Sequence, residues 1–313
     1  MKSGGVRVSS GAPRATAPAR TTRAEALEKG RVVLAPSPTA SLDASLILAS
    51  LLGLRRETVV AFPDEAVGAD VLVRYDEALV RRAAGRPVAY LTGKKEFYGR
   101  DFVVNEAVLV PRPDTELLVE LALDLGDEIA SSGHRRILVH ECCVGSGAVA
   151  LSVAAERPAW LVSGSDLSPS ALEVAIGNAS RVLPGERPGG PVRLFLADLF
   201  ENRDSSGGLG DECRLDLILA NPPYVESALA RELSAAWGEP LLALDGGVDG
   251  LDLVRRLVPT AAAMLDRGGA LLVEADGSQA AVLRSLFRIA GLVDVRSEKD
   301  LAGAQRVTVG VRP

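Results

Sequence analysis

Short apolar segments alternate with segments of helical periodicity beyond residue 113. The apolar segments lie at 137–139, 160–162, 192–196, 217–220, 270–274 and 307–311, with another near residue 293. The helical segments lie at about 114–129, 169–182, 251–265 and 279–290, and one more begins near Gly147. Strands that alternate with helices form a mostly parallel sheet with helices on both faces. The sequence therefore predicts an α/β domain over residues 113–313.

A different pattern precedes this domain. Leucine and isoleucine recur at helical spacing from residue 42 to 52, just before Gly53, and glycine commonly ends helices. A second helical pattern covers about 69–84. We therefore expect a small helical domain at residues 25–92. Residues 93–112 have an extended pattern, and we expect them to form a β-hairpin linker between the domains.

The first segment of the chain, residues 1–24, is rich in Gly, Ser, Ala, Pro and Thr and carries five basic residues before the first acid, Glu25. This composition predicts a disordered tail. An organelle transit peptide has the same composition. We expect a cytoplasmic protein, and an organelle remains the alternative if the segment directs import.

Composition excludes several classes of protein. Of the 313 residues, 47% are hydrophobic and 24% are charged, and no apolar run is long enough to cross a membrane. The formal charge of -6 and the pI near 5.2 argue against a surface that neutralises many phosphates, so we expect no stable binding to nucleic acid. Three cysteines and two histidines form neither a disulfide framework nor a zinc motif, so we expect a reducing compartment and no bound metal.

The apolar run at 217–220 stops at Asn221-Pro222-Pro223-Tyr224. Two prolines prevent further strand pairing, so a stiff loop follows the strand. The side-chain oxygen of Asn221 and the main-chain oxygen of Pro222 can each accept a proton of a planar NH2 group, while Tyr224 packs against the flat group. Such a loop turns the nitrogen towards an electrophile. An ordinary proline-rich loop is the alternative.

A second set of residues suits a nucleoside. The segment from Glu141 to Gly147 follows a strand and opens a helix, and its glycines allow a ligand to approach the backbone closely. Asp166 ends the next strand, where a carboxylate can accept both hydroxyls of a ribose, although a helix cap is its alternative role. Asp198 ends the following strand, where it could contact an adenine amine while Leu199 covers the ring; a solvated turn is the alternative. Strand ends of one sheet converge on one crevice, so an adenosine site beside a site for a planar NH2 group predicts methyl transfer from S-adenosylmethionine to nitrogen.

Several longer motifs resemble the HemK/PrmC family, the protein-(glutamine-N5) methyltransferases that modify peptide chain release factors. The resemblance covers about residues 38–313, and the most characteristic motif is Val110-Pro111-Arg112-Pro113-Asp114-Thr115-Glu116. Other matching segments are 87–93, 96–98, 221–224, 239–251, 300–303 and 306–307.

The resemblance implies a class I S-adenosylmethionine-dependent methyltransferase fold, which is Rossmann-like with a seven-stranded sheet, together with a helical N-terminal substrate-binding domain. It also implies that the substrate is the glutamine of a Gly-Gly-Gln loop in a release factor, inserted between the two domains, and that its methylation modulates translation termination. The implied substrate-binding residues are Asn221, Pro222, Pro223 and Tyr224, and the implied catalytic residues among them are Asn221, Pro222 and Tyr224. The implied cofactor residues are Glu141, Cys143, Val144, Gly145, Ser146, Gly147, Asp166, Asp198, Leu199 and Asn221. We expect a monomer.

The chain departs from the family pattern in the segment 141–147 and at residue 199, and two of these departures bear on the cofactor site. Cys143 stands where the family usually has the first glycine of the loop, and a positive φ there would cost about 1 kcal/mol. Leu199 stands where tryptophan can occur, which gives less stacking on adenine. Neither change removes a group that the chemistry requires.

Three other functions remain open. A related enzyme could methylate glutamine in a ribosomal protein, and an adenine-N6 methyltransferase of nucleic acid also uses an Asn-Pro-Pro-Tyr loop. The third possibility is a cofactor-binding or scaffold protein without turnover.

Overall fold

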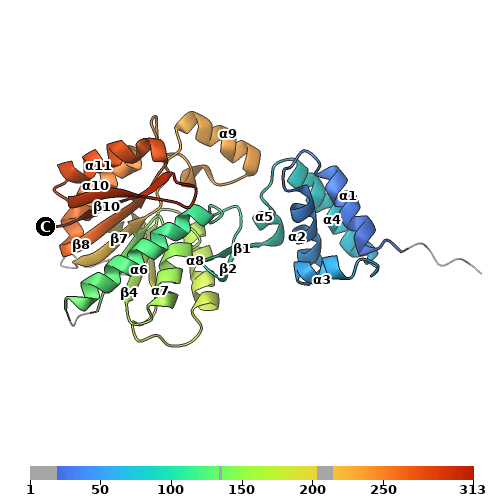
Figure 1. Cartoon of the computed structure of the whole chain (residues 1–313), viewed down its shortest axis with the longest axis horizontal. Helices are drawn as coiled ribbons and strands as arrows, with labels where there is room; N and C mark the ends of the chain where they lie inside the picture. Colours follow the sequence, from blue (N-terminus) through green and yellow to red (C-terminus); the bar gives the residue numbers. More distant parts are fainter. Residues whose placement is uncertain (1–19, 134–135, 203–213) are drawn as a thin grey trace, which may run out of the picture. The chain divides into compact units, whose positions relative to one another are not determined.

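The computed structural model describes residues 20–133, 136–202 and 214–313. Contacts divide the chain after Ala83 into two compact units (Figure 1). The sequence placed the division at residue 92. By its contacts, helix α5 (Val88–Thr92) therefore groups with the second unit, although the sequence assigned it to the helical domain.

The first unit is helical, and its first helix begins inside the segment that was expected to be a disordered tail. The N–H of Glu25 donates to Oγ1 of Thr22 (3.3 Å), and the N–H of Thr22 donates to Oε2 of Glu25 (2.8 Å), which is a capping box. This box starts helix α1 at Arg23, so the last two residues of the segment expected to be disordered are helical. Residues 1–19 lie outside the described residues. The helices are α1 (Arg23–Val33), α2 (Ala40–Leu52), α3 (Arg56–Ala61) and α4 (Ala69–Ala83).

The second unit opens with α5 and the predicted hairpin, whose strands β1 (Lys94–Phe97) and β2 (Arg100–Val103) pair antiparallel. The side-chain amide of Asn178 fastens the hairpin to helix α8 (Pro169–Val182), since it accepts from the N–H of Val103 (2.8 Å) and donates to its carbonyl (2.9 Å). Pairing ends at β2, and residues 104–112 form no strand although the pattern had indicated extended backbone there.

A twisted sheet forms the middle of the second unit (Figure 1), in the order β6-β5-β4-β3-β7-β8-β10-β9. Strand β6 has only two residues, so seven strands of ordinary length remain, which confirms the predicted fold class. Pairing is parallel from β5 through β8, and β10 is antiparallel to β8 and β9. The strands are β3 (Leu138–Cys142), β4 (Leu161–Asp166), β5 (Arg193–Asp198), β6 (Glu201–Asn202), β7 (Leu215–Ala220), β8 (Leu265–Glu274), β9 (Val293–Lys299) and β10 (Gln305–Val311).

Helices cover both faces of the sheet, as predicted (Figure 1). Alternate residues of β7 enter two different cores: Leu217 and Leu219 pack with α6 and α7, whereas Ile218 and Ala220 pack with α10 and α11. Helix α9 was not predicted, because only one of its residues, Ala230, is buried and the apolar stripe is narrow. The remaining helices are α6 (Glu116–Ser131), α7 (Ala148–Glu156), α9 (Ser227–Trp237), α10 (Asp252–Met264) and α11 (Ala280–Ile289), with short 3-10 turns η1 (Pro113–Thr115), η2 (Leu241–Ala243) and η3 (Gly277–Gln279).

The order of the strands fixes where a ligand can bind. The chain runs outward from β3 to β4 and β5, and then returns to the other side of β3 with β7. Open α/β sheets bind ligands at such a reversal, beyond the carboxyl ends of the strands. The segments that follow β3 and β7 therefore flank the expected crevice.

The buried imidazole of His140, in strand β3, makes the stability of the sheet depend on pH. Its ring nitrogens lie 2.9 Å and 3.1 Å from the hydroxyls of Ser163 and Ser165, and the ring stacks on Phe195. Burial lowers the pKa of His140 to about 3. The folded protein therefore keeps this ring neutral while the unfolded chain takes up a proton below its ordinary pKa of about 6.5.

We predict that the stability contributed by this ring is lost as the pH falls below about 6.5. The difference in free energy of unfolding between the wild type and a His140→Gln variant should be constant above pH 7 and shrink by about 1.4 kcal/mol per pH unit from pH 6 to 4. Urea titrations at several pH values measure it. A difference that does not change with pH would show that the ring is protonated equally in both states.

Candidate active site

A cavity of about 610 Å³ lies at the carboxyl ends of β3, β4, β5 and β7, and all of its lining residues belong to the second unit. Its volume is ordinary for a small-molecule site. Three of the predicted site residues do not line the cavity: Gly147, Pro222 and Tyr224. Those that do are Glu141, Cys143, Val144, Gly145, Ser146, Asp166, Asp198, Leu199, Asn221 and Pro223.

The loop after β3 adopts the tight conformation that its glycines suggested. Gly145 and Gly147 have φ of 52° and 81°, and the N–H of Gly147 donates to the carbonyl of Val144 (2.8 Å). A Cβ on Gly147 would lie 2.8 Å from a methyl of Leu151 on a backbone of positive φ, so a larger residue would be strained at the start of this helix. Cys143 has φ of 59°, the positive value anticipated for this position.

Asp166 holds this loop from the neighbouring strand. Its Oδ2 accepts from the N–H of Gly145 (2.8 Å) and its Oδ1 from the N–H of Ser168 (2.9 Å). Ser168 itself caps α8 by accepting from the N–H of Ala171 (3.2 Å), so the carboxylate is not needed as the cap. Burial raises the pKa of Asp166, and the bonds from Ser168 and Gly145 oppose that rise. The carboxylate retains lone-pair capacity beyond these backbone bonds with which it can accept from a ligand hydroxyl.

Glu141 and Asp198 are engaged with neighbours that sequence reasoning did not identify. Oε2 of Glu141 accepts from the N–H of Ala150 (2.7 Å) in α7, and burial raises the pKa of this carboxyl well above its usual range. Oδ1 of Asp198 pairs with the guanidinium of Arg256 at 3.0 Å. Leu199 is buried at the cavity wall with φ of 59°, and its carbonyl accepts from the hydroxyl of Ser165 (2.6 Å).

The Asn221–Tyr224 loop follows β7, all six residues of which are buried. Nδ2 of Asn221 donates to Oγ1 of Thr115 (3.3 Å), so Oδ1 is left to accept from a ligand. The next residue, Val225, pairs with segment 244–246: it donates to the carbonyl of Leu244 (2.9 Å) and accepts from the N–H of Gly246 (2.8 Å).

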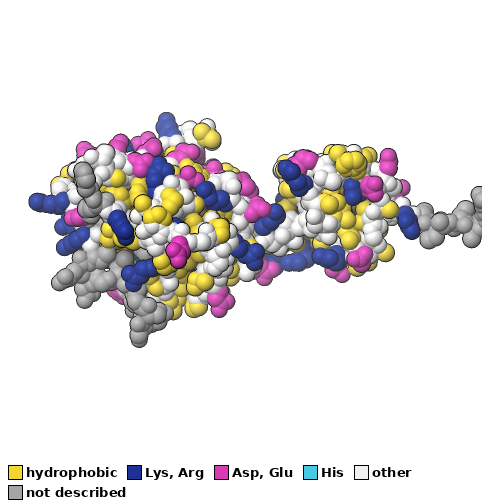
Figure 2. Space-filling view, turned by 90° about the horizontal axis from the view of Figure 1, so that it is seen from below, with side chains coloured by type: hydrophobic (Ala, Val, Ile, Leu, Met, Phe, Trp, Pro, Cys, Tyr) yellow, Lys and Arg dark blue, Asp and Glu magenta, His cyan; other side chains and the backbone are white. Residues whose placement is uncertain are grey.

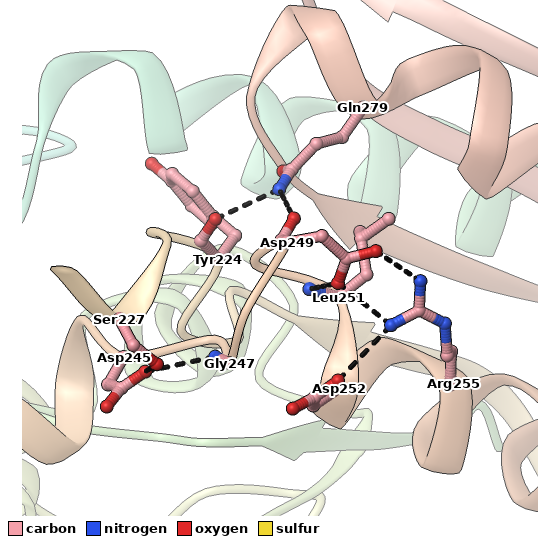
Figure 3. A network of polar contacts seen from close by, with 9 residues as sticks. All are labelled: Tyr224, Ser227, Asp245, Gly247, Asp249, Leu251, Asp252, Arg255 and Gln279. Atoms are coloured by element: carbon pink, nitrogen blue, oxygen red, sulfur yellow. Dashed lines mark hydrogen bonds and ion pairs between the residues drawn. The ribbon is translucent and has the colours of Figure 1, made fainter. Parts of the chain in front are cut away.

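A polar network holds that loop from behind (Figure 3). Nε2 of Gln279 donates to the carbonyls of Tyr224 (3.0 Å) and Asp249 (3.2 Å). Asp245 accepts from the hydroxyl of Ser227 (2.5 Å) and from the N–H of Gly247 (3.0 Å). These contacts hold the end of the loop at Tyr224 and the neighbouring turn at 245–249.

Arg112 and Glu116 belong to the most characteristic motif of the chain. Arg112 forms an ion pair of 2.6 Å with Glu239, a carboxylate with no exposed side-chain surface, and Oε1 of Glu239 also accepts from the N–H of Val110 (3.2 Å). Glu116 accepts from the N–H of Tyr98 (2.9 Å). Both residues therefore make contacts within the second unit. The motifs around residues 112 and 239 were recognised as characteristic, but nothing in them indicated that they would meet.

The described part of the chain contains no group of three or more His, Cys, Asp or Glu side chains arranged to hold a metal ion. None of its helices is long and apolar enough to cross a membrane. His134 lies outside the described residues. On the face shown in Figure 2, acidic and basic side chains of the second unit lie among one another.

An open sheet of this order, with a glycine loop after its first strand and Asn-Pro-Pro-Tyr after its fourth parallel strand, defines a methyltransferase of the S-adenosylmethionine-dependent class. Known proteins agree. The model of the PrmC N-terminal domain matches residues 25–93. The release factor glutamine methyltransferase of Burkholderia pseudomallei (strain K96243) is 40% identical over 302 residues, which cover 95% of this chain and 99% of that protein. The enzyme of the same name from Koribacter versatilis (strain Ellin345) is 35% identical over 281 residues, with coverage of 89% and 94%.

The chain therefore belongs to the family of release factor glutamine methyltransferases. A crystal structure of the hMettl16 catalytic domain, in complex with MAT2A 3'UTR hairpin 1, aligns with a TM-score of 0.51, 14% identity and coverage of 78% of this chain and 81% of that one. At this identity the likeness concerns the fold alone.

The positive φ at Cys143 predicts that glycine is more stable than alanine at this position, the opposite of what is expected at the neighbouring Cys142. Alanine keeps the positive φ that a side chain disfavours, so we expect Cys143→Gly to be more stable than Cys143→Ala by about 1 kcal/mol. Cys142 lies in strand β3, where glycine is less stable than alanine by roughly 0.5–1 kcal/mol, so the matched pair there should show the opposite order. Free energies of unfolding from urea titration of the four variants measure both differences. A Cys143→Ala variant at least as stable as Cys143→Gly would contradict the strain.

Proposed function

We propose that this protein transfers a methyl group from S-adenosylmethionine to N5 of the glutamine in the Gly-Gly-Gln motif of peptide chain release factors, and thereby modulates translation termination. Membership of the family supports the substrate. The observation that carries the chemistry is the Asn221 side chain at the cavity wall, whose amide nitrogen is committed to Thr115 and whose oxygen can accept.

The cavity fits the methyl donor. Acidic residues outnumber basic ones in its lining, which suits a ligand with a positive sulfur and an ammonium group. Asp166 can accept the ribose hydroxyls, Leu199 can cover the adenine, and the turn of segment 143–147 brings backbone close to the ligand. We assign cofactor binding to these residues together with Glu141, Asp198 and Asn221.

The cofactor supplies a methyl group already activated by positive sulfur. The protein must therefore position the glutamine nitrogen in line with it, which is worth up to roughly 7–11 kcal/mol in favourable cases. Oδ1 of Asn221 and the carbonyl of Pro222 would accept the two amide protons, while Pro223 and Tyr224 pack against the planar group. These hydrogen bonds strengthen as the nitrogen gains positive charge, which stabilises the transition state more than the bound substrate.

The remaining expectations belong to the same proposal. We assign substrate binding to the helical segment 25–92 and expect a monomer in the cytoplasm, with an organelle as the alternative if residues 1–24 direct import. No stable binding of nucleic acid is expected.

The substrate is tested by peptide mass spectrometry of a release factor incubated with S-adenosylmethionine and the protein. We expect one added methyl on the Gly-Gly-Gln glutamine. The Asn221→Ala variant should be slower by roughly 100- to 1000-fold, the range found when one transition-state hydrogen-bonding group is removed. A release factor with that glutamine replaced by alanine is the control. Methylation of a ribosomal protein or of DNA, without methylation of the release factor, would contradict the proposal.

The cofactor site is tested separately by calorimetry. An Asp166→Asn variant loses the charge of a carboxylate that accepts from two backbone amides, so we expect its affinity for S-adenosylmethionine to fall by about 10- to 100-fold. Asp127→Asn is the matched control, because Asp127 pairs with Arg157 on the exposed side of α6. Equal affinities of the two variants would remove Asp166 from the site.

A further inference from the structure

Thr115 occupies a decisive position beside Asn221. It is 4% exposed, it ends the turn η1, and it lines the cavity next to the amide whose nitrogen donates to its hydroxyl oxygen. An asparagine amide has nearly equal shapes in its two flipped orientations, and only its hydrogen-bond partners decide which is present. One orientation turns an acceptor to the substrate and the other turns a donor to it.

A threonine hydroxyl does not decide the orientation by itself, because it can donate to the oxygen of an amide or accept from its nitrogen. The direction is set if the proton of Thr115 is committed elsewhere. An acceptor for that proton is available in Glu274, at the end of β8, whose pKa the side chains of Thr115 and Tyr224 lower by hydrogen bonding.

Glu274 has no other evident task. It is 1% exposed, it does not line the cavity, and its Oε2 makes no hydrogen bond among the described residues. Burial raises the pKa of this carboxyl to about 7, against the bond from Thr115 and the charge of Arg306. Burial of a carboxyl group with an unpaired oxygen costs free energy, and since Glu274 does not line the cavity, contact with the ligand does not explain why it is there.

The surroundings of Glu274 come from several elements. Arg306 of β10 supplies the positive charge, and it pairs with Asp114 of η1 and with Asp300, each at 3.2 Å. Tyr224 follows β7. The carboxyl thus joins η1, β8, β10 and the Asn-Pro-Pro-Tyr loop at one buried point.

We propose that Thr115 and Glu274 are positioning residues that fix the Asn221 side chain with its oxygen towards the substrate nitrogen. Glu274 accepts the Thr115 proton, the lone pair of Thr115 then faces the NH2 of Asn221, and Oδ1 remains for the substrate. The same carboxyl holds the hydroxyl of Tyr224. The catalytic part of this inference rests on the proposed glutamine methylation, whereas the orientation of the amide does not.

The experiment compares Thr115→Val, which keeps the shape and removes the hydroxyl, with Thr115→Ser, which keeps the hydroxyl. We expect kcat and kcat/KM of Thr115→Val to fall together by roughly 10- to 100-fold, because a transition-state contact is misdirected. Thr115→Ser should retain most of the activity. Calorimetry of both variants with S-adenosylmethionine measures separately any loss of cofactor affinity, since Asn221 is also assigned to the cofactor site, and kcat at saturating cofactor then reports the misdirected substrate contact.

Two further variants separate positioning from general damage. Glu274→Met should lower kcat in the same direction as Thr115→Val, and the double variant should be no worse than the more impaired single one, since both changes break one chain of bonds. Thr308→Val is the matched control: this threonine is equally buried in β10 and its hydroxyl lies 3.0 Å from that of Ser297, outside the site. It should lose stability without losing kcat.

A second readout needs no substrate. The side-chain NH2 signals of Asn221 can be assigned in 1H–15N spectra by their absence in Asn221→Ala. Their exchange with solvent should be slow in the wild type and at least about tenfold faster in Thr115→Val. Fast exchange in the wild type, or unchanged exchange and kcat in Thr115→Val, would overturn the proposed orientation. If the wild type methylates no release factor, the proposed function fails while the exchange rates still decide the orientation.

Discussion

Parallel pairing of β3 with β7 is the constraint on which the whole site depends. Cys142 and Ala220, the last residues of the two strands, are partners in the register, although 77 residues lie between them in the sequence. The next residue after each strand end therefore enters the same cavity: Cys143 opens the glycine loop and Asn221 opens the proline loop. A shift of one residue in this register would turn the buried residues of β7 to the opposite faces and carry Asn221 away from the glycine loop. Such a shift would also break a specific contact between the two strands, in which the carboxylate of Asp216 in β7 accepts from the N–H of Leu138 in β3 (2.9 Å).

The characteristic motifs of the chain interact in pairs, which gives them a common physical purpose. Segment 110–116 contributes Arg112 to Glu239 and Thr115 to Asn221, and Gln279 ties Tyr224 to the glycine-rich turn at 246–250. That turn approaches the proline loop so closely that a Cβ on Gly250 would lie 2.1 Å from the carbonyl of Tyr224. Each motif is thus the fixed support of another, and the Asn-Pro-Pro-Tyr loop is held from three sides.

Periodicity and punctuation were sufficient to predict the sheet, the strand ends that meet at the cavity and most of the helices, although not the short helices α3 and α5. They could not predict helix α9, which buries a single residue, or the start of α1, which depends on the reciprocal bonds of Thr22 and Glu25. Within the site, the sequence identified groups by their chemistry at strand ends, and ten of its residues line the cavity. The sequence did not identify Glu274 as a site residue, because an acid at the end of a buried strand does not differ in sequence from other strand ends. Its partner Thr115 is also far away in the sequence.

The departure at Cys143 shows how the fold tolerates an unfavourable residue where chemistry does not need the favourable one. The positive φ is imposed by contacts of the neighbouring residues: Val144 donates to the carbonyl of Ser165 (3.0 Å), and Gly145 donates to Asp166. Strain of about 1 kcal/mol at one residue is small beside such bonds together with the burial of β3 and β4. Burial also raises the pKa of the Cys143 thiol well above its usual value, so the side chain is a neutral, weakly polar group in the cavity wall. A glycine at this position only makes the positive φ easier to adopt. A cysteine can replace it because the hydrogen-bond acceptors and carboxylates of the site come from other residues.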